Sequence, residues 1–127
     1  MEKQERVATT ADRLREAMAE TGKKQADLMR ETGRDRGAIS SYLSGKYEPK
    51  QKAINKLAVA LGVSEMWLWG YDVPRERTPE QKKNDKLSLL VVRLRRDPAF
   101  YDVVEKLDQV APEQLASLGS LLAGLLK

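Results

Sequence analysis

The feature that most constrains the fold is the spacing of the apolar residues, which recur every three or four positions along nearly the whole chain. This period is typical of amphipathic helices, whereas the apolar residues of strands alternate. Glycines at positions 22, 33, 45 and 62 follow several of these stretches, and glycine commonly ends a helix. No two alternating stretches are joined by a hairpin turn. The sequence therefore predicts an all-α protein.

The predicted helices fall into two regions. Five short helices are expected within residues 1–70, and the polar, proline-containing stretch that follows is interpreted as a linker over residues 71–79. Thr78 and Gln81 then form the capping-box pattern with which a helix begins. Residues 80–127 contain three further amphipathic segments. We therefore expect a five-helix domain followed by a small helical C-terminal region.

The charge distribution points to an anionic partner. The chain carries a net charge of +4. Residues 21–56 alone hold nine Lys or Arg and four Asp or Glu, so this window carries about +5. The absence of Cys and His excludes disulfides and thiol nucleophiles and leaves zinc without its usual ligands. With no nucleophile–base pair or phosphate-cradling glycine loop in view, we expect no enzyme, no cofactor and no bound metal.

Two stretches bear on membranes and secretion. The N-terminal "MEKQERVATT" lacks the apolar segment of a secretion signal. The most apolar stretch, residues 115–126, has 12 residues, whereas a membrane-spanning helix needs about 20. We therefore expect a soluble protein of the bacterial cytoplasm or nucleoid, without a membrane partner.

The stretch "DRGAISSYLSG", residues 35–45, has an unusual polar face. On a helix, Ile39 and the other apolar residues share one side. The other side carries Arg36 among glycine and serine, whereas an ordinary solvated face is rich in Lys and Glu. Such a helix is suited to close approach to another surface.

Several motifs in the first half of the chain occur together in one known family. They are "KKQADL", then Gly33, Ile39, "LSGKYEP" and "LAVALGVSEMWL". With two short helices around a glycine-containing turn, this half resembles the lambdoid-repressor helix-turn-helix family, often called Xre-like, which has five short helices. The stretch "LGVSEMWLWGYDVP" is similar to the end of the DNA-binding region in temperate-phage repressors. Nothing resembles the self-cleaving peptidase domain of some phage repressors, so the resemblance is to a short form.

The resemblance implies which residues contact double-stranded DNA. The helix over residues 35–44 would lie in the major groove. The base-reading positions would be Arg36, Gly37, Ser40 and Ser41, of which Gly37 offers clearance only. The phosphate-binding positions would be Lys24, Gln25, Ser44, Lys46 and Lys50. Because few of these side chains are long, part of the specificity is expected from water-mediated contacts or DNA shape.

Plainer roles stay open for several of these residues. For Arg36 the alternative is a solvated residue of the first helical turn, for Gln25 a helix cap, and for Lys46 and Lys50 ordinary surface lysines. The two tryptophans, at positions 67 and 69, are expected to pack in the core and against the linker, respectively, rather than to stack on bases.

The C-terminal segment "PEQLASLGSLLAGLLK" is interpreted as a dimerisation surface. Its apolar stripe consists of Leu115, Leu118, Leu121, Leu122 and Leu125. Repressors of this type read half-sites about one helical turn, ~34 Å, apart and therefore act as two copies. The alternatives are additional core for the first domain and a docking site for an antirepressor.

The leading hypothesis is thus a sequence-specific transcriptional repressor that binds a near-palindromic operator as a homodimer. The alternative is an antitoxin or other regulator whose C-terminal helices bind a protein partner. Antitoxin tails are often disordered until bound, whereas this tail is apolar and capped, which favours the repressor.

Overall fold

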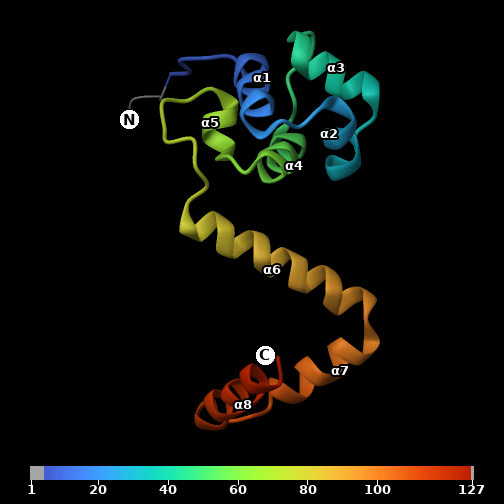
Figure 1. Ribbon diagram of the computed structural model, residues 1–127, viewed down its shortest axis with the longest axis vertical. Coiled ribbons are helices and arrows are strands. Elements are labelled where there is room, and N and C mark those ends of the chain that lie inside the picture. The colour runs from blue at the N-terminus through green and yellow to red at the C-terminus, as the bar shows by residue number, and fades with distance from the viewer. Residues whose placement is uncertain (1–4, 127) are drawn as a thin grey trace. The chain divides into compact units, whose positions relative to one another are not determined.

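A computed structural model describes residues 5–126, and over these residues the protein is all-α, as predicted (Figure 1). The helices are α1 (Thr10–Thr21), α2 (Gln25–Thr32), α3 (Arg36–Ser44), α4 (Gln51–Leu61), α5 (Glu65–Trp69), α6 (Pro79–Arg96), α7 (Pro98–Leu107) and α8 (Pro112–Leu125). The β-pairing within the described residues is limited to two isolated bridges. The chain divides into two units, Met1–Lys83 and Asn84–Lys127, which are described separately.

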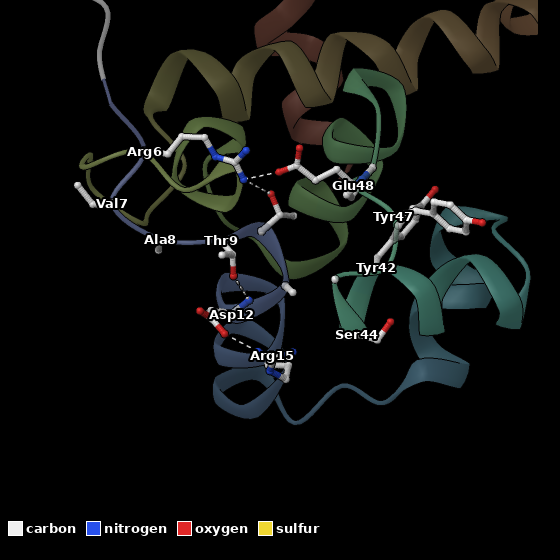
Figure 2. Close-up of a pocket in the computed structure, with 14 residues that line it drawn as sticks. Arg6, Val7, Ala8, Thr9, Asp12, Arg15, Tyr42, Ser44, Tyr47 and Glu48 are labelled. Carbon is white, nitrogen blue, oxygen red and sulfur yellow. Dashed lines mark hydrogen bonds and ion pairs between the residues drawn. The ribbon is translucent and has the colours of Figure 1, made fainter.

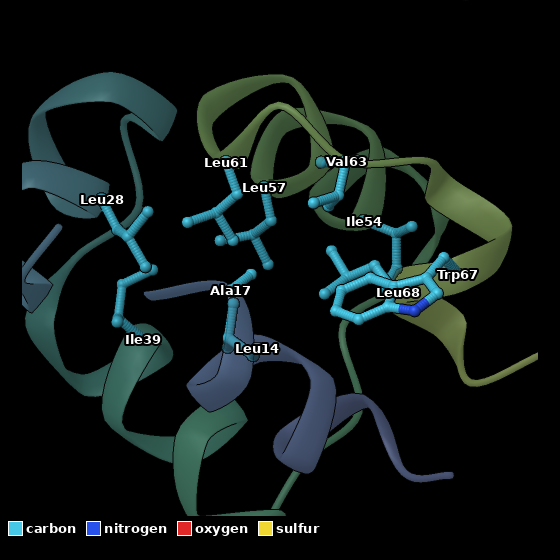
Figure 3. Packing of buried hydrophobic residues seen from close by; sticks show 11 residues of the cluster. Leu14, Ala17, Leu28, Ile39, Ile54, Leu57, Leu61, Val63, Trp67 and Leu68 are labelled. Carbon is cyan, nitrogen blue, oxygen red and sulfur yellow. The ribbon is translucent and has the colours of Figure 1, made fainter. Parts of the chain in front are cut away.

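Helices α1 to α5 of the first unit pack around a shared apolar core (Figure 3). Each of the five helices contributes at least one fully buried side chain to it. These side chains include Leu14, Leu28, Ile39, Leu57 and Leu68. Burial of such a side chain stabilises the folded state by about 1.5–3 kcal/mol. The core therefore fixes the five helices relative to one another.

Trp67 lies in the core, as expected, whereas Trp69 packs against the core cluster. Trp67 is 6% exposed and belongs to the core cluster. Trp69 is half-buried and packs against that cluster, as does Val73 of the segment interpreted as a linker. Both indoles therefore serve packing within the first unit.

Several helix ends are formed as the sequence indicates. The Asp35 carboxylate accepts a hydrogen bond from the Ala38 N–H at 2.8 Å and caps α3. Thr78 and Gln81 form the expected capping box at the start of α6, with hydrogen bonds of 2.8 and 3.1 Å. Ser64 is the N-cap residue of α5, but its side chain makes no capping hydrogen bond.

Residues 71–79, interpreted as a linker, belong to the first unit and are held against its helix α5. Arg77 is buried, and its guanidinium donates to the Val63 carbonyl and to the Glu65 carboxylate, both at 2.8 Å. The second oxygen of Glu65 accepts from the Gln81 amide at 3.0 Å. This network attaches the segment and the first turn of α6 to α5.

The N-terminal segment is fixed to the end of α5. The backbone N–H groups of Val7 and Ala8 donate to the Gly70 carbonyl at 2.7 and 3.1 Å. Gly70 has a φ of +110°, and a Cβ there would lie 2.1 Å from the Ala8 carbonyl oxygen. Only glycine fits both the backbone conformation and the close approach.

The second unit contains α6 from Asn84 onward together with α7 and α8, and these regular helices have little burial. None of the described residues of these helices is buried. Large apolar side chains are exposed on α6, among them Leu87, Leu89 and Leu90. The helices therefore form without a core of their own like that of α1 to α5.

Candidate nucleic-acid interface

Helices α2 and α3 and the turn between them form a helix-turn-helix. Gly33 ends α2 with a φ of +73°, a left-handed conformation that favours glycine. Ile39 is fully buried and anchors α3 in the core. The opposite face of α3 is therefore directed away from the core.

The structure places most of the proposed base-reading residues on this outer face. Arg36, Gly37 and Ser40 are exposed and Ser41 is half-buried. Arg36 is the first residue of α3. No described carboxylate forms an ion pair with its guanidinium, so it is available to an external acceptor.

A hydrogen bond connects the two helices of the motif on the same side. The Ser40 hydroxyl donates to the Gln25 side-chain oxygen at 3.3 Å. Gln25 is the first residue of α2 and is half-buried. The Ser40 hydroxyl is thus directed toward the start of α2 and already has a partner within the protein. The Arg36 guanidinium, by contrast, has no ion-pair partner among the described residues.

Lys24 precedes α2 and is exposed. Its backbone N–H donates to the Asp27 carboxylate at 2.8 Å, and Arg30 donates to the same carboxylate at 2.9 Å. The hydrogen bond from Lys24 and then that from Arg30 lower the pKa of Asp27 from its ordinary value of 3.8. Asp27 therefore stays charged and fixes the backbone at the start of α2.

The end of α3 and the loop after it carry the remaining predicted phosphate-binding residues. The Ser44 hydroxyl donates to the Ser41 carbonyl at 3.2 Å and accepts from the Lys46 N–H at 3.3 Å, so Ser44 shapes the loop. The Lys46 ammonium lies 5.5 Å from the centroid of the Tyr47 ring. Lys46 and Lys50 are exposed, and neither forms an ion pair among the described residues.

Two hollows flank this loop. The first, of about 770 Å³, lies between the N-terminal segment with the start of α1 and the end of α3 with its following loop (Figure 2). Its ionic side chains pair with one another: Arg6 pairs with Glu48, and Arg15 pairs with Asp12. This hollow therefore has little uncompensated charge.

The second hollow, of about 580 Å³, lies between α3 and the start of α4. Arg34, Lys50 and Lys52 line it. Of these, sequence reasoning selected only Lys50. The basic window over residues 21–56 was the available signal, but it does not indicate which lysines and arginines share a surface.

The residues predicted for dimerisation lie on α8. Leu115, Leu121, Leu122 and Leu125 are exposed, by 40–79%, and Leu118 is half-buried. This apolar stripe faces solvent to a large extent. No described helix is both long and apolar enough to cross a membrane.

Comparison with known proteins agrees with this geometry. Residues 11–66 match the family model of the helix-turn-helix domain. The match begins in α1 and ends at the start of α5, so it spans α1 to α4 with the first residues of α5 and leaves the second unit outside. The first unit thus contains a helix-turn-helix domain, a class of domain that binds DNA. A search of curated proteins returned no match.

Proposed function

We propose that this protein is a sequence-specific transcriptional repressor of the lambdoid, Xre-like type, in the short form without a peptidase domain. It binds a near-palindromic operator as a homodimer, with α3 in the major groove. It acts on DNA in the bacterial cytoplasm and uses no catalysis or cofactor. The observation that carries this proposal is the outer face of α3, where an unpaired Arg36 stands among very small side chains.

Arg36 is the main base-reading residue of the proposal. Its planar guanidinium presents two donors that match O6 and N7 of guanine. Its position at the first turn of α3 suits this role, since the N-terminal residues of a recognition helix contact base edges. Gly37 and Ser41 keep the approach close. Ser40 supports the contact indirectly, because its hydroxyl is directed to Gln25.

Phosphate contacts fix the register of the domain on the duplex. Lys24 and Gln25 stand at the N-terminus of α2, where backbone N–H groups and the helix dipole favour an anion. Ser44 is the last residue of α3, and Lys46 and Lys50 lie in the segment between α3 and α4. Contacts before and after α3 in the chain would hold it in the groove.

The second unit supplies the dimer contact in this proposal. It has 44 residues, and the absence of burial in its described helical residues leaves it below the core that a small domain needs to fold alone. A second copy presents the same apolar stripe, and a two-fold axis lets one patch contact itself. That symmetry also matches the two halves of an inverted-repeat operator.

The test is selection of bound sites from random duplex DNA with the purified full chain at near-physiological salt. We expect enrichment of a motif with two inverted halves about one helical turn, ~34 Å, apart. The matched control is Arg36→Ala, which removes the main base contact and leaves the core unchanged. Selection of a single half-site would contradict the dimeric reading, and no enrichment at all would contradict a sequence-specific repressor.

A second candidate function is supported by the same exposed leucines. A regulator of the antitoxin type, or a repressor controlled by an antirepressor, would use α8 to bind a different protein. Sedimentation of the purified chain separates the two candidates. A monomer at tens of micromolar would favour the second, since a self-associating stripe would then form dimers.

A further inference from the structure

Helices α6 and α7 each present an apolar stripe to solvent. On α6, Leu87, Leu90 and Val91 are 43–48% exposed. A hollow of about 510 Å³ includes part of this stripe, and its lining residues all belong to α6. On α7, Val103 is 54% exposed and lies beside the half-buried Val104. Among the described residues no other helix packs along either of the two, so both stripes lack a partner within the chain.

The two helices carry opposite charge. Residues 84–96, which form most of α6, hold four basic residues and one acidic residue. Residues 97–108, which contain α7, hold four acidic residues and one basic residue. A basic helix and an acidic helix attract each other, whereas two copies of either one repel. The charge of α6 is therefore complementary to that of α7.

Some of these charges border the apolar stripes and have no local partner. Lys86 and Arg95 lie four positions from apolar residues of the α6 stripe, and Asp108 lies four positions from Val104 of α7. Residues four apart are neighbours on a helix surface. Glu105 lies beside Asp108 by the same spacing rule. None of the four charged side chains forms an ion pair among the described residues, so all four are available to a complementary surface.

The connection between α6 and α7 prevents their stripes from meeting within one chain. Helix α6 ends at Arg96 and α7 begins at Pro98, so Asp97 alone connects them (Figure 1). Two helices lie side by side and antiparallel when a loop of about 2–5 residues reverses the chain. The corner is also fixed, because Asp97 lies 3.7 Å from the Arg93 guanidinium, which lies 4.2 Å from the centroid of the Phe100 ring. The complementary surfaces of α6 and α7 therefore need a second chain.

From these observations we infer that two copies of the chain exchange these helices, so that the stripe of α6 in one copy packs on the stripe of α7 in the other. A two-fold axis forms this contact twice, and short connections favour such exchange. The contact joins two different helices and is separate from the α8 stripe, which contacts its own copy. The inference rests on the proposed function, which requires two copies, and adds a second dimer contact to it.

The test reverses the charges that border each stripe, in the full chain. One variant, Lys86→Glu with Arg95→Glu, makes the borders of the α6 stripe acidic. The other, Glu105→Lys with Asp108→Lys, makes the border of the α7 stripe basic. Each variant alone brings like charges together in both contacts of its dimer, so its dissociation constant should rise by at least about tenfold. Sedimentation equilibrium at low ionic strength measures this constant, because salt screens exposed charges.

An equimolar mixture of the two variants is the decisive measurement. In the mixed dimer the reversed α6 meets the reversed α7, and the unchanged α6 meets the unchanged α7. Both contacts then join opposite charges, so the mixture should associate about as tightly as the wild type. A mixture that stays dissociated would overturn the inference. An α7 variant that associates like the wild type would also overturn it, because α6 would then have another partner.

Lys82→Glu with Arg96→Glu is the matched control. It reverses the same number of charges on the same helix, but both residues are exposed on the side of α6 directed away from Leu87. Its dissociation constant should stay that of the wild type, and circular dichroism verifies the helix content of every variant. An equal rise for the control would overturn the inference, since net charge rather than the stripe would then govern association.

These measurements need no DNA, which separates the inference from the repressor proposal. Association restored by mixing, without selection of an operator, would support the exchange and contradict the repressor. Operator selection by a chain whose variants all associate like the wild type would have the opposite meaning and would leave α8 as the dimer contact. A wild type that is monomeric at tens of micromolar would overturn the exchange.

Discussion

The two units of this protein are built from similar helical patterns but differ in burial. In the first unit, α1 to α5 each bury at least one apolar residue in a shared core. In the second, α7 has a stripe as regular as that of α4, yet its described residues are not buried. Apolar spacing thus predicts a helix and the face that seeks a partner, but not where that partner is. In the first unit the partners are neighbouring helices, whereas we propose a second copy for the second unit.

The largest expected effect lies in the core of the first unit. Leu57 is fully buried, so Leu57→Ala should lower the free energy of unfolding by about 2–5 kcal/mol, because it removes apolar contacts and leaves a cavity. Both tryptophans lie in this unit, so fluorescence during urea unfolding reports on it alone. Leu121→Ala is the control, since Leu121 is 66% exposed. An equal loss from Leu121→Ala would contradict the independence of the two units.

A charge on the α8 stripe should separate the copies without unfolding the first unit. Leu122→Glu places a carboxylate in the proposed apolar contact, where an unpaired charge is strongly disfavoured. We expect the dimer dissociation constant to rise by at least about tenfold, or 1.4 kcal/mol, in sedimentation equilibrium. Ser120→Glu adds the same charge on the opposite side of α8 and should leave the dimer intact. Dissociation by both variants, or by neither, would be inconsistent with this stripe as the contact.

Single substitutions at the DNA-binding surface of the first unit are expected to weaken DNA binding in two different ways. Arg36→Ala should weaken binding to the selected site by about 1–3 kcal/mol and relax the base preference at one position. Lys46→Ala should instead weaken all sequences similarly and reduce the salt slope by about one unit. Fluorescence titrations on the selected and scrambled sites distinguish the two patterns. A uniform loss for Arg36→Ala would make it a phosphate contact.

Local rules made the helices and several of their ends predictable. The caps formed by Asp35, and by Thr78 with Gln81, connect residues three apart, and such interactions can be read directly from sequence. Which side chains of a short helix are buried is harder to predict from the sequence than its caps. Met66 is apolar and precedes Trp67 and Leu68 on the five-residue α5, yet it is 39% exposed, whereas those two side chains are buried.

Tertiary pairings were the part that sequence could not supply. The segment interpreted as a linker is polar, but its Arg77 pairs with groups 12 and 14 positions away. Likewise, Arg34 and Lys52 share a hollow only because α3 and α4 bring positions 34 and 52 together. The exposed face of α3 was predictable from its buried Ile39, since the two faces of one helix are fixed by its period.

The smallest expected effect concerns the cap of α2 in the packed unit. The pKa of Asp27 is lowered by the Lys24 N–H and by Arg30, so the folded state binds this proton less readily than the unfolded state. Its contribution is therefore present above the ordinary value of 3.8 and is lost as the pH falls through the lowered pKa. Asp27→Asn keeps an acceptor but removes the charge, so tryptophan-detected unfolding should depend less steeply on pH in the acid range. Asp97→Asn makes the same change at the cap of α7, in the other unit, and should leave that profile unchanged. If both variants alter the pH profile equally, the two units unfold together in acid. The difference in burial between the units would then not make them independent in stability.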